Sequence, residues 1–183
     1  MDLENKVTVF SSPIFQVEEL TIKSKQNSLP KPRYRITCQD WANILPITRE
    51  GKAILIRQPR FGSLESVLET PGGLIDKEDR DPMFAALREL EEETGYTSQR
   101  ILPLGAFNPN PAIMSNTVHF FLAIDCFIAT ERKHFQDPDE DIEIVQIQIN
   151  ELDMLVRTCR INHALSALCI QLALNKFLVP PSK

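Results

Sequence analysis

Residues 72–96 read GGLIDKEDRDPMFAALRELEEETGY, and this stretch carries the strongest helix signal in the chain. Pro82 suits the first position of a helix, and Asp81 can cap that helix from the position before it. Gly95 suits the helix end, because glycine adopts the left-handed backbone conformation found there. These signals together predict a helix from about Pro82 to Thr94.

The predicted helix has two faces of different character. Each residue turns the helix by about 100°, so residues three or four apart share a face. Glu89, Glu92 and Glu93 fall within an arc of about 100°. A separate arc carries apolar residues: Met83, Ala86, Leu87 and Leu90. We therefore expect one face to pack against the core and the other to present carboxylates.

The three glutamates on one face repel one another, at a cost of roughly 0.2–0.5 kcal/mol per pair. A divalent cation would offset that repulsion. Mg²⁺ prefers oxygen ligands, and it binds through a few carboxylates together with waters and substrate phosphates. A solvated acidic face is the commoner meaning of such a run, so the surrounding sequence must decide between the two.

The surrounding sequence resembles the Nudix box, whose pattern is G-x5-E-x7-R-E-U-x-E-E-x-G-U, with U a bulky apolar residue. The second half of the pattern is matched throughout, by Arg88, Glu89, Leu90, Glu92, Glu93, Gly95 and Tyr96. The first half departs from it. Asp79 stands where the pattern has glutamate, and one extra residue separates Gly73 from Arg88.

This resemblance implies a hydrolase that cleaves a diphosphate joined to another group. Glu89, Glu92, Glu93 and the carbonyl of Gly72 would bind Mg²⁺, or Mn²⁺ in its place. Arg88 would hold the glutamates by charge-assisted hydrogen bonds, although an ordinary surface salt bridge is the alternative. Arg88 and Glu92 are accordingly expected to be catalytic, with the metal neutralising the phosphates and activating a water.

Sequence outside the box is similar to the ADP-ribose pyrophosphatase subfamily, from about residue 35 to residue 175. The stretch RQPR (57–60), followed by ETPGG (69–73), resembles motifs of that subfamily before the box. The resemblance implies ADP-ribose or a similar nucleoside diphosphate sugar as the substrate. The alternatives are another diphosphate, such as a GDP-sugar or a dinucleotide cofactor, and a nucleotide sensor without turnover.

Several residues outside the box are candidates for substrate binding. Arg57 and Arg60 suit phosphate oxygens, because a guanidinium group donates paired hydrogen bonds. Trp41 can stack on a nucleobase or serve as a partly buried anchor. Pro111 lies fifteen residues after Tyr96, close to a marker proline of the subfamily.

Two further groups of residues have open roles. Glu140, in the acidic loop 137–143, is the expected general base by resemblance, with Asp139 and Asp141 as neighbouring alternatives. Glu69 would support the metal or a basic partner, or it is an ordinary carboxylate at the end of a strand. His163 is expected to face a neighbouring helix.

Composition excludes several other classes of protein. The formal charge of −5 argues against binding to nucleic acid or to anionic membranes. No apolar run reaches the roughly 18–20 residues of a membrane span, and the first residues lack the layout of a secretory signal. The cysteines, Cys38, Cys126, Cys159 and Cys169, are scattered, which predicts free thiols and a cytoplasmic location.

The order of elements predicts an α/β (α+β) sandwich, and the resemblance implies the Nudix-type α/β/α arrangement with a mixed sheet. Strands are expected in the runs 41–48, 52–58, 63–70, 118–129 and 144–149, and a second helix at about 162–177. Residues 1–38 are expected to form a β-rich arm, with a flexible stretch at 24–32. Residues 39–183 would form the hydrolase domain. By resemblance, the arm is expected to join a homodimer.

Overall fold

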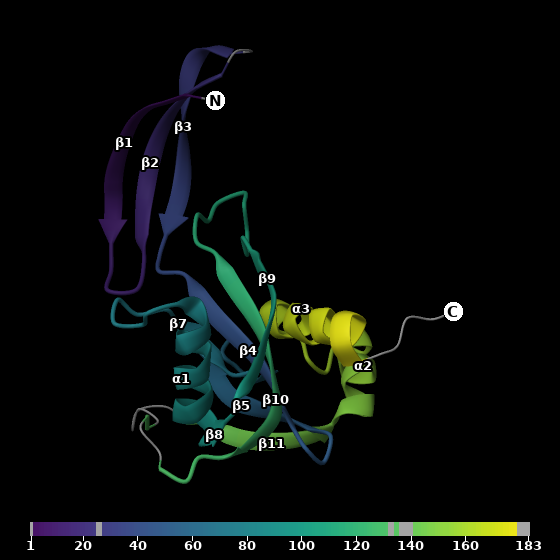
Figure 1. Ribbon diagram of the computed structural model, residues 1–183. Coiled ribbons are helices and arrows are strands. Elements are labelled where there is room, and N and C mark those ends of the chain that lie inside the picture. The colour runs from purple at the N-terminus through teal and green to yellow at the C-terminus, as the bar shows by residue number, and fades with distance from the viewer. Residues whose placement is uncertain (1, 25–26, 132–133, 136–140, 179–183) are drawn as a thin grey trace. The chain divides into compact units, whose positions relative to one another are not determined.

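The computed structural model describes residues 2–24, 27–131, 134–135 and 141–178 (Figure 1). The chain divides into two compact units. The first comprises Met1–Asp40 and Phe107–Val118, and the second comprises Trp41–Ala106 and His119–Lys183. Strands and helices are combined in a mixed α+β fold, as the sequence predicts.

The elements follow one another along the chain in this order: β1 (Asp2–Ser11), β2 (Gln16–Ser24), β3 (Asn27–Thr37), β4 (Trp41–Thr48), β5 (Lys52–Arg60), β6 (Glu65–Glu69), β7 (Gly72–Leu74), α1 (Pro82–Thr94), β8 (Tyr96–Thr97), β9 (Arg100–Phe107), β10 (Val118–Ile128), β11 (Glu143–Gln148), α2 (Ile149–Arg157), α3 (Ala164–Ala173) and the π-helix η1 (Leu174–Leu178).

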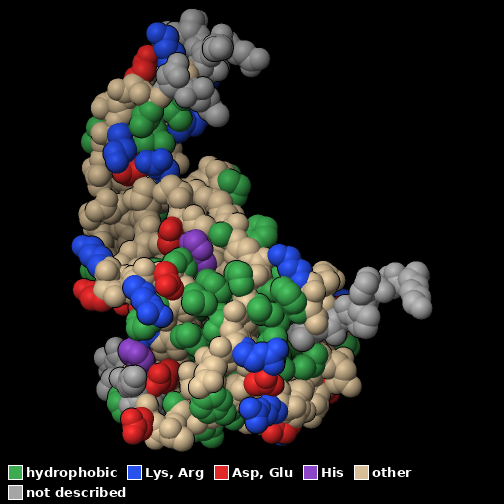
Figure 2. Space-filling model, viewed as in Figure 1, with side chains coloured by type: hydrophobic (Ala, Val, Ile, Leu, Met, Phe, Trp, Pro, Cys, Tyr) green, Lys and Arg blue, Asp and Glu red, His purple; other side chains and the backbone are tan. Residues whose placement is uncertain are grey.

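The first unit is built on an antiparallel sheet with the order β1-β2-β3. Glu18 of β2 is buried and binds Lys6 at 2.9 Å and Arg35 at 2.7 Å, so one carboxylate ties all three strands together. Figure 2 shows charged side chains interspersed with hydrophobic ones over this unit. These cross-strand ion pairs add to the pairing of the three strands.

One prediction for this unit is wrong. The stretch 24–32 was expected to be flexible, but β3 begins at Asn27 and runs through Pro32, which lies opposite Thr21. β3 is an edge strand of its sheet. A proline lacks the backbone N–H that a central strand needs, but an edge strand tolerates its absence.

The second unit contains a larger sheet in which β11, β5, β4, β10 and β8 are successive neighbours. β6 pairs with β5, β7 pairs with β4, and β9 pairs with β10. The hairpin predicted around residues 49–52 is confirmed, because β4 ends at Thr48 and the antiparallel β5 begins at Lys52.

Strand β4 lies between two helical layers. Ala42 and Ile44 pack with Ala86 and Leu90 of α1 in one buried cluster. On the α3 side, the buried Cys169 thiol interacts with the backbone of Leu45, where α3 contacts β4. Figure 1 shows α1 and α3 on opposite sides of the sheet. Burial on both faces explains why β4 reads as a nearly continuous apolar run.

The first helix matches its prediction closely. α1 spans Pro82–Thr94, the Asp81 side chain accepts the N–H of Phe84 at 2.8 Å, and Gly95 ends the helix with φ +73°. Met83 is a correction: it was placed on the core face, but it is exposed in the first turn. The buried surface of α1 begins at Ala85 and Ala86.

The C-terminal half contains elements that the sequence pattern did not reveal. The predicted helix at 162–177 corresponds to α3 followed by η1, but α2 was not predicted. α2 is short and begins without a side-chain cap, so it lacks the usual start signal. β7 and β8 span three and two residues, and β9 contains Pro103 and Gly105, so pairing alone defines these strands. In the described residues, no helix is long and apolar enough to cross a membrane.

Candidate active site

The carboxylates of α1 lie around the guanidinium group of Arg88. Its Nη1 donates to Glu92 Oε2 at 2.7 Å and to Glu89 Oε1 at 3.0 Å. Its Nη2 donates to the carbonyl oxygen of Leu74 at 2.9 Å, which ties the helix to β7. The Arg88 side chain is only 13% exposed. Its contacts with the glutamates are therefore largely buried and are not the surface salt bridge considered above.

The box loop supplies a further partner for Arg88. Asp79 Oδ1 and Oδ2 accept hydrogen bonds from Arg88 Nε at 3.1 Å and Nη2 at 3.0 Å, and the Asp79 side chain is 2% exposed. Asp79 Oδ2 also accepts the N–H of Asp76 at 2.9 Å, which closes the loop on itself. Despite the extra residue in the loop, its buried acid is therefore directed at the box arginine.

Titration of this pair reflects the same contacts. Burial acts to lower the pKa of Arg88, but its bonds to Asp79 and the charges of Glu89 and Glu92 outweigh burial and raise it. Burial acts to raise the pKa of Asp79, but the hydrogen bonds from Arg88 outweigh it, so this pKa lies below its usual value. Both groups are therefore charged at neutral pH.

The glycines before the helix approach the carboxylates closely. The N–H of Gly72 donates to Glu93 Oε2 at 2.9 Å, and Glu93 is buried. A Cβ placed on Gly73 would lie 2.5 Å from Glu89 Oε1, and one placed on Gly72, whose φ is +156°, would lie 2.3 Å from the carbonyl oxygen of Ala42. At Gly72 only glycine fits, because the neighbouring atoms belong to the backbone, whereas a side chain at Gly73 would displace the Glu89 carboxylate.

The donor set fits a divalent cation. Four carboxylates, those of Asp76, Asp79, Glu89 and Glu92, lie within 3.5 Å of the single positive charge of Arg88. A further cation beside these carboxylates would offset their excess negative charge. Hard carboxylate oxygens are the ligands that Mg²⁺ and Mn²⁺ take. Among the residues that the structure describes, no group of three or more histidine, cysteine, aspartate or glutamate side chains is already arranged around a metal position.

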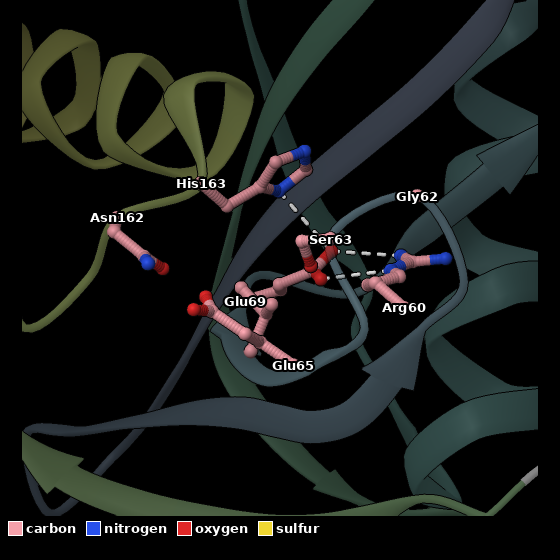
Figure 3. A pocket seen from close by; sticks show the side chains of 8 residues that line it. Arg60, Gly62, Ser63, Glu65, Glu69, Asn162 and His163 are labelled. Carbon is pink, nitrogen blue, oxygen red and sulfur yellow. Dashed lines mark hydrogen bonds and ion pairs between the residues drawn. The ribbon is translucent and has the colours of Figure 1, made fainter.

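A second polar cluster surrounds Glu69 at the end of β6 (Figure 3). Arg60 Nε donates to Glu69 Oε1 at 2.8 Å, and Nη2 donates to Oε2 at 2.7 Å. His163 Nδ1 lies 3.1 Å from Glu69 Oε2 on another side. Of the roles considered for Glu69, the structure shows the contact with basic partners. The His163 ring contacts this carboxylate, so the expectation that it faces a neighbouring helix is wrong.

The Glu69 carboxylate is held in its charged form. Burial acts to raise its pKa, but hydrogen bonds from Arg60 and His163 outweigh burial and lower the pKa to about 2. The same residues line a cavity of about 380 Å³, together with Ser63, Glu65 and Asn162. Arg60 is thus anchored by a buried carboxylate while part of its side chain faces a cavity.

The other predicted substrate residues are spread over the surface. Arg57 pairs with Glu143 at 3.3 Å and lines a different cavity from Arg60, because residues three apart on a strand point to opposite faces. Trp41 is half-buried at the start of β4, and Pro111 is exposed in the first unit. Their contacts with a substrate stay predictions.

The predicted general base, Glu140, and its neighbour Asp139 lie outside the described residues. Asp141 is described and exposed. Two groups of site residues were missed in the sequence: Asp79 as the paired partner of Arg88, and the polar residues that meet His163 at the start of α3. The position of Asp79 in the box pattern could have predicted its contact with Arg88. The contacts of His163 join residues far apart in the chain, and the local sequence does not predict them.

Comparison with known proteins agrees with this geometry. A NUDIX domain model matches residues 39–164. An ADP-ribose pyrophosphatase of Bacillus subtilis (strain 168) is 34% identical over 128 residues, which cover 70% of this chain and 68% of that protein. A methanol dehydrogenase activator of Bacillus methanolicus is 29% identical over 128 residues, with the same two coverages.

A solved structure shows the same fold. The crystal structure of an ADP compounds hydrolase matches with a TM-score of 0.83 at 24% identity, over 95% of this chain and 92% of that one. The domain match spans most of the chain and contains α1 with the glycines before it. The chain therefore belongs to the Nudix family and is a Nudix hydrolase that resembles the ADP-ribose pyrophosphatases.

Proposed function

We propose that this hydrolase cleaves the diphosphate of ADP-ribose, or of a similar nucleoside diphosphate sugar, into two phosphomonoesters. One observation carries the proposal: a single buried guanidinium, that of Arg88, faces four carboxylates beside a glycine strand end that leaves no room for a side chain. Such a surface is suited to a cation and, through it, to phosphate oxygens. The ADP-ribose pyrophosphatase from Bacillus subtilis supports the choice of substrate.

Mg²⁺ is the proposed cofactor, with Mn²⁺ as a substitute, held by Glu89, Glu92, Glu93 and the carbonyl of Gly72. When bound, the ion neutralises phosphate charge and lowers the pKa of a water that attacks phosphorus. Arg88 keeps Glu89 and Glu92 in place, since it donates to both carboxylates. The N–H of Gly72 does the same for Glu93. Glu140 is proposed as the base that removes the proton from the attacking water.

Substrate contacts are proposed for four residues. Arg57 and Arg60 would donate to phosphate or ribose oxygens, and the bidentate anchor on Glu69 fixes the direction of the Arg60 guanidinium in advance. Trp41 would stack on the base. Pro111 would shape the substrate-contacting loop of the first unit.

We also propose that the protein acts in the cytoplasm as a homodimer joined through residues 1–38. The thiols of all four cysteines are free in the structure, as a reducing compartment requires. The first unit exposes large apolar side chains, including those of Val7, Val9 and Phe10. Sedimentation that yields a monomer mass at micromolar concentration would refute the dimer.

The decisive experiment measures release of phosphomonoesters from ADP-ribose, GDP-mannose, NADH and diadenosine polyphosphates, with Mg²⁺ or Mn²⁺. Wild type is compared with Glu93→Gln, which keeps the shape of the side chain but removes its charge. We expect ADP-ribose turnover that falls by about 10²–10³-fold in the variant. If GDP-mannose were turned over faster than ADP-ribose, the proposed substrate would be wrong, but the proposed active site would stand. Nucleotide binding without turnover of any compound would establish a sensor instead.

A further inference from the structure

We propose that His163 and Ser166, in the first turn of α3, are positioning residues for the metal-binding face of α1, acting through the backbone of residues 69–73. This inference rests on the proposed function, because it concerns how the same carboxylates are held. It assigns a role to His163 of the second polar cluster, whose residues come from β5, β6 and the start of α3 and include no member of the box.

The first step is the contact between α3 and the end of β6. Ser166 is fully buried, and its Oγ accepts the N–H of Thr70 at 3.0 Å. His163 Nδ1 lies 2.9 Å from Ser166 Oγ and 3.1 Å from Glu69 Oε2. Because an ionised carboxylate only accepts hydrogen bonds, the tautomer with its hydrogen on Nδ1 is the one that can donate to Glu69. The start of α3 therefore holds two consecutive residues, Glu69 and Thr70.

The second step leads from Thr70 to β4. The Thr70 hydroxyl donates to Asn43 Oδ1 at 2.5 Å, and both residues are buried. Asn43 is paired with Gly72 across the β4–β7 ladder, and the N–H of Ile44 donates to the carbonyl of Pro71 at 2.9 Å. Hydrogen bonds from the α3 side thus hold the strand end in place. These groups are buried, where a polar group without a hydrogen bond costs free energy.

The third step reaches the carboxylates on the other side of the sheet. The N–H of Gly72 donates to Glu93 Oε2 at 2.9 Å, and Glu89 Oε1 fits closely against Gly73. A shift of this strand end by a few tenths of an ångström would therefore move or unbind Glu93 and open the gap beside Glu89. Outer residues of this kind commonly change metal affinity or activity by about 10–100-fold when they are removed.

The test compares Ser166→Ala with the matched control Ser98→Ala. Ser98 is likewise a buried serine, and its hydroxyl bonds the carbonyl of Ile124, away from residues 69–73. A second pair uses His163→Asn, whose amide nitrogen can replace Nδ1 as a donor, and His163→Phe, which cannot donate. Binding of Mn²⁺ alone is measured by electron paramagnetic resonance, and kcat and KM are measured with ADP-ribose and Mg²⁺.

We expect Ser166→Ala and His163→Phe to bind Mn²⁺ about tenfold more weakly and to lose about tenfold in kcat with KM unchanged. Ser98→Ala and His163→Asn should stay within about twofold of wild type. Folded Ser166→Ala and His163→Phe proteins that bind Mn²⁺ like wild type would overturn the proposal. If Ser166→Ala does not fold, the pair at His163 decides, since that side chain is partly exposed.

Failure of the proposed function would be recognisable separately. If wild type itself bound no Mn²⁺, the metal site would be refuted, and the positioning role would be judged from Trp41, the only tryptophan. Trp41 is paired with Leu74 beside the Asn43–Gly72 pair. A shift of metal-free Trp41 fluorescence in Ser166→Ala but not in Ser98→Ala would support the contact path, and identical spectra would overturn it.

Discussion

Arg88 and Asp79 are joined by two parallel hydrogen bonds, of 3.1 and 3.0 Å, that link the box helix to the loop before it. The loop contains one residue more than the box pattern, and its acid still contacts the guanidinium group. Its role is therefore to orient Arg88, which in turn holds Glu89 and Glu92.

Asp79→Asn should lower kcat/KM by about tenfold, because Arg88 loses its charged, buried partner and is held less firmly toward the glutamates. Glu78→Gln is the matched control, since Glu78 is the adjacent loop acid and is exposed. Steady-state kinetics with ADP-ribose distinguish the two. If both substitutions lowered kcat/KM equally, the negative charge of the loop would matter for activity and the contact with Arg88 would not.

Gly73→Ala should weaken Mn²⁺ binding by about tenfold or more, because the added methyl group would lie 2.5 Å from Glu89 Oε1 and displace that carboxylate. Gly62→Ala is the control, since a Cβ there meets nothing within 4 Å. Mn²⁺ titration in the absence of substrate measures the difference. Wild-type affinity in Gly73→Ala would mean that Glu89 moves without consequence for the metal.

Stability should depend on pH through Glu69. Its pKa is lowered in the folded protein to about 2 from its ordinary value of 4.5. The carboxylate therefore stabilises the fold above about pH 4.5, by about 3 kcal/mol, and this contribution is lost as the pH falls toward 2. Glu69→Gln should be less stable than wild type at pH 7, and most of the difference should vanish by pH 3.

Urea unfolding of both proteins at the two pH values measures this difference. Glu143→Gln removes the same charge from an exposed pair with Arg57 and should change stability by less than about 1 kcal/mol. A gap between Glu69→Gln and wild type that stays constant from pH 7 to pH 3 would contradict the proposed ionisation of Glu69.

Asp81→Ala should lower the free energy of unfolding by about 1 kcal/mol, because the N–H of Phe84 loses its side-chain acceptor at the start of α1. For a chain of this size the melting temperature should fall by about 2–4 °C. Asp81→Asn retains an acceptor oxygen and should stay close to wild type. Thermal unfolding without metal checks this, and an equal loss in both variants would point to charge rather than capping.

The sequence by itself determined the local elements around α1 and the carboxylate face of that helix. Proline, aspartate and glycine at residues 82, 81 and 95 specify the ends of the helix through short-range backbone preferences. The spacing of Glu89, Glu92 and Glu93 specifies their common face through helical geometry alone. These features depend on neighbours within a few residues, so the amino-acid order suffices to predict them.

Only the tertiary structure decided which distant residues meet. β7 and β8 are too short to show a pattern, and pairing with β4 and β10 is what defines them. Ser166 lies 96 positions from Thr70, and nothing in the local sequence of either predicts their bond. Burial makes an unmade hydrogen bond costly, so packing of α3 on the sheet selects these partners and, with them, the position of the strand end beside the carboxylates.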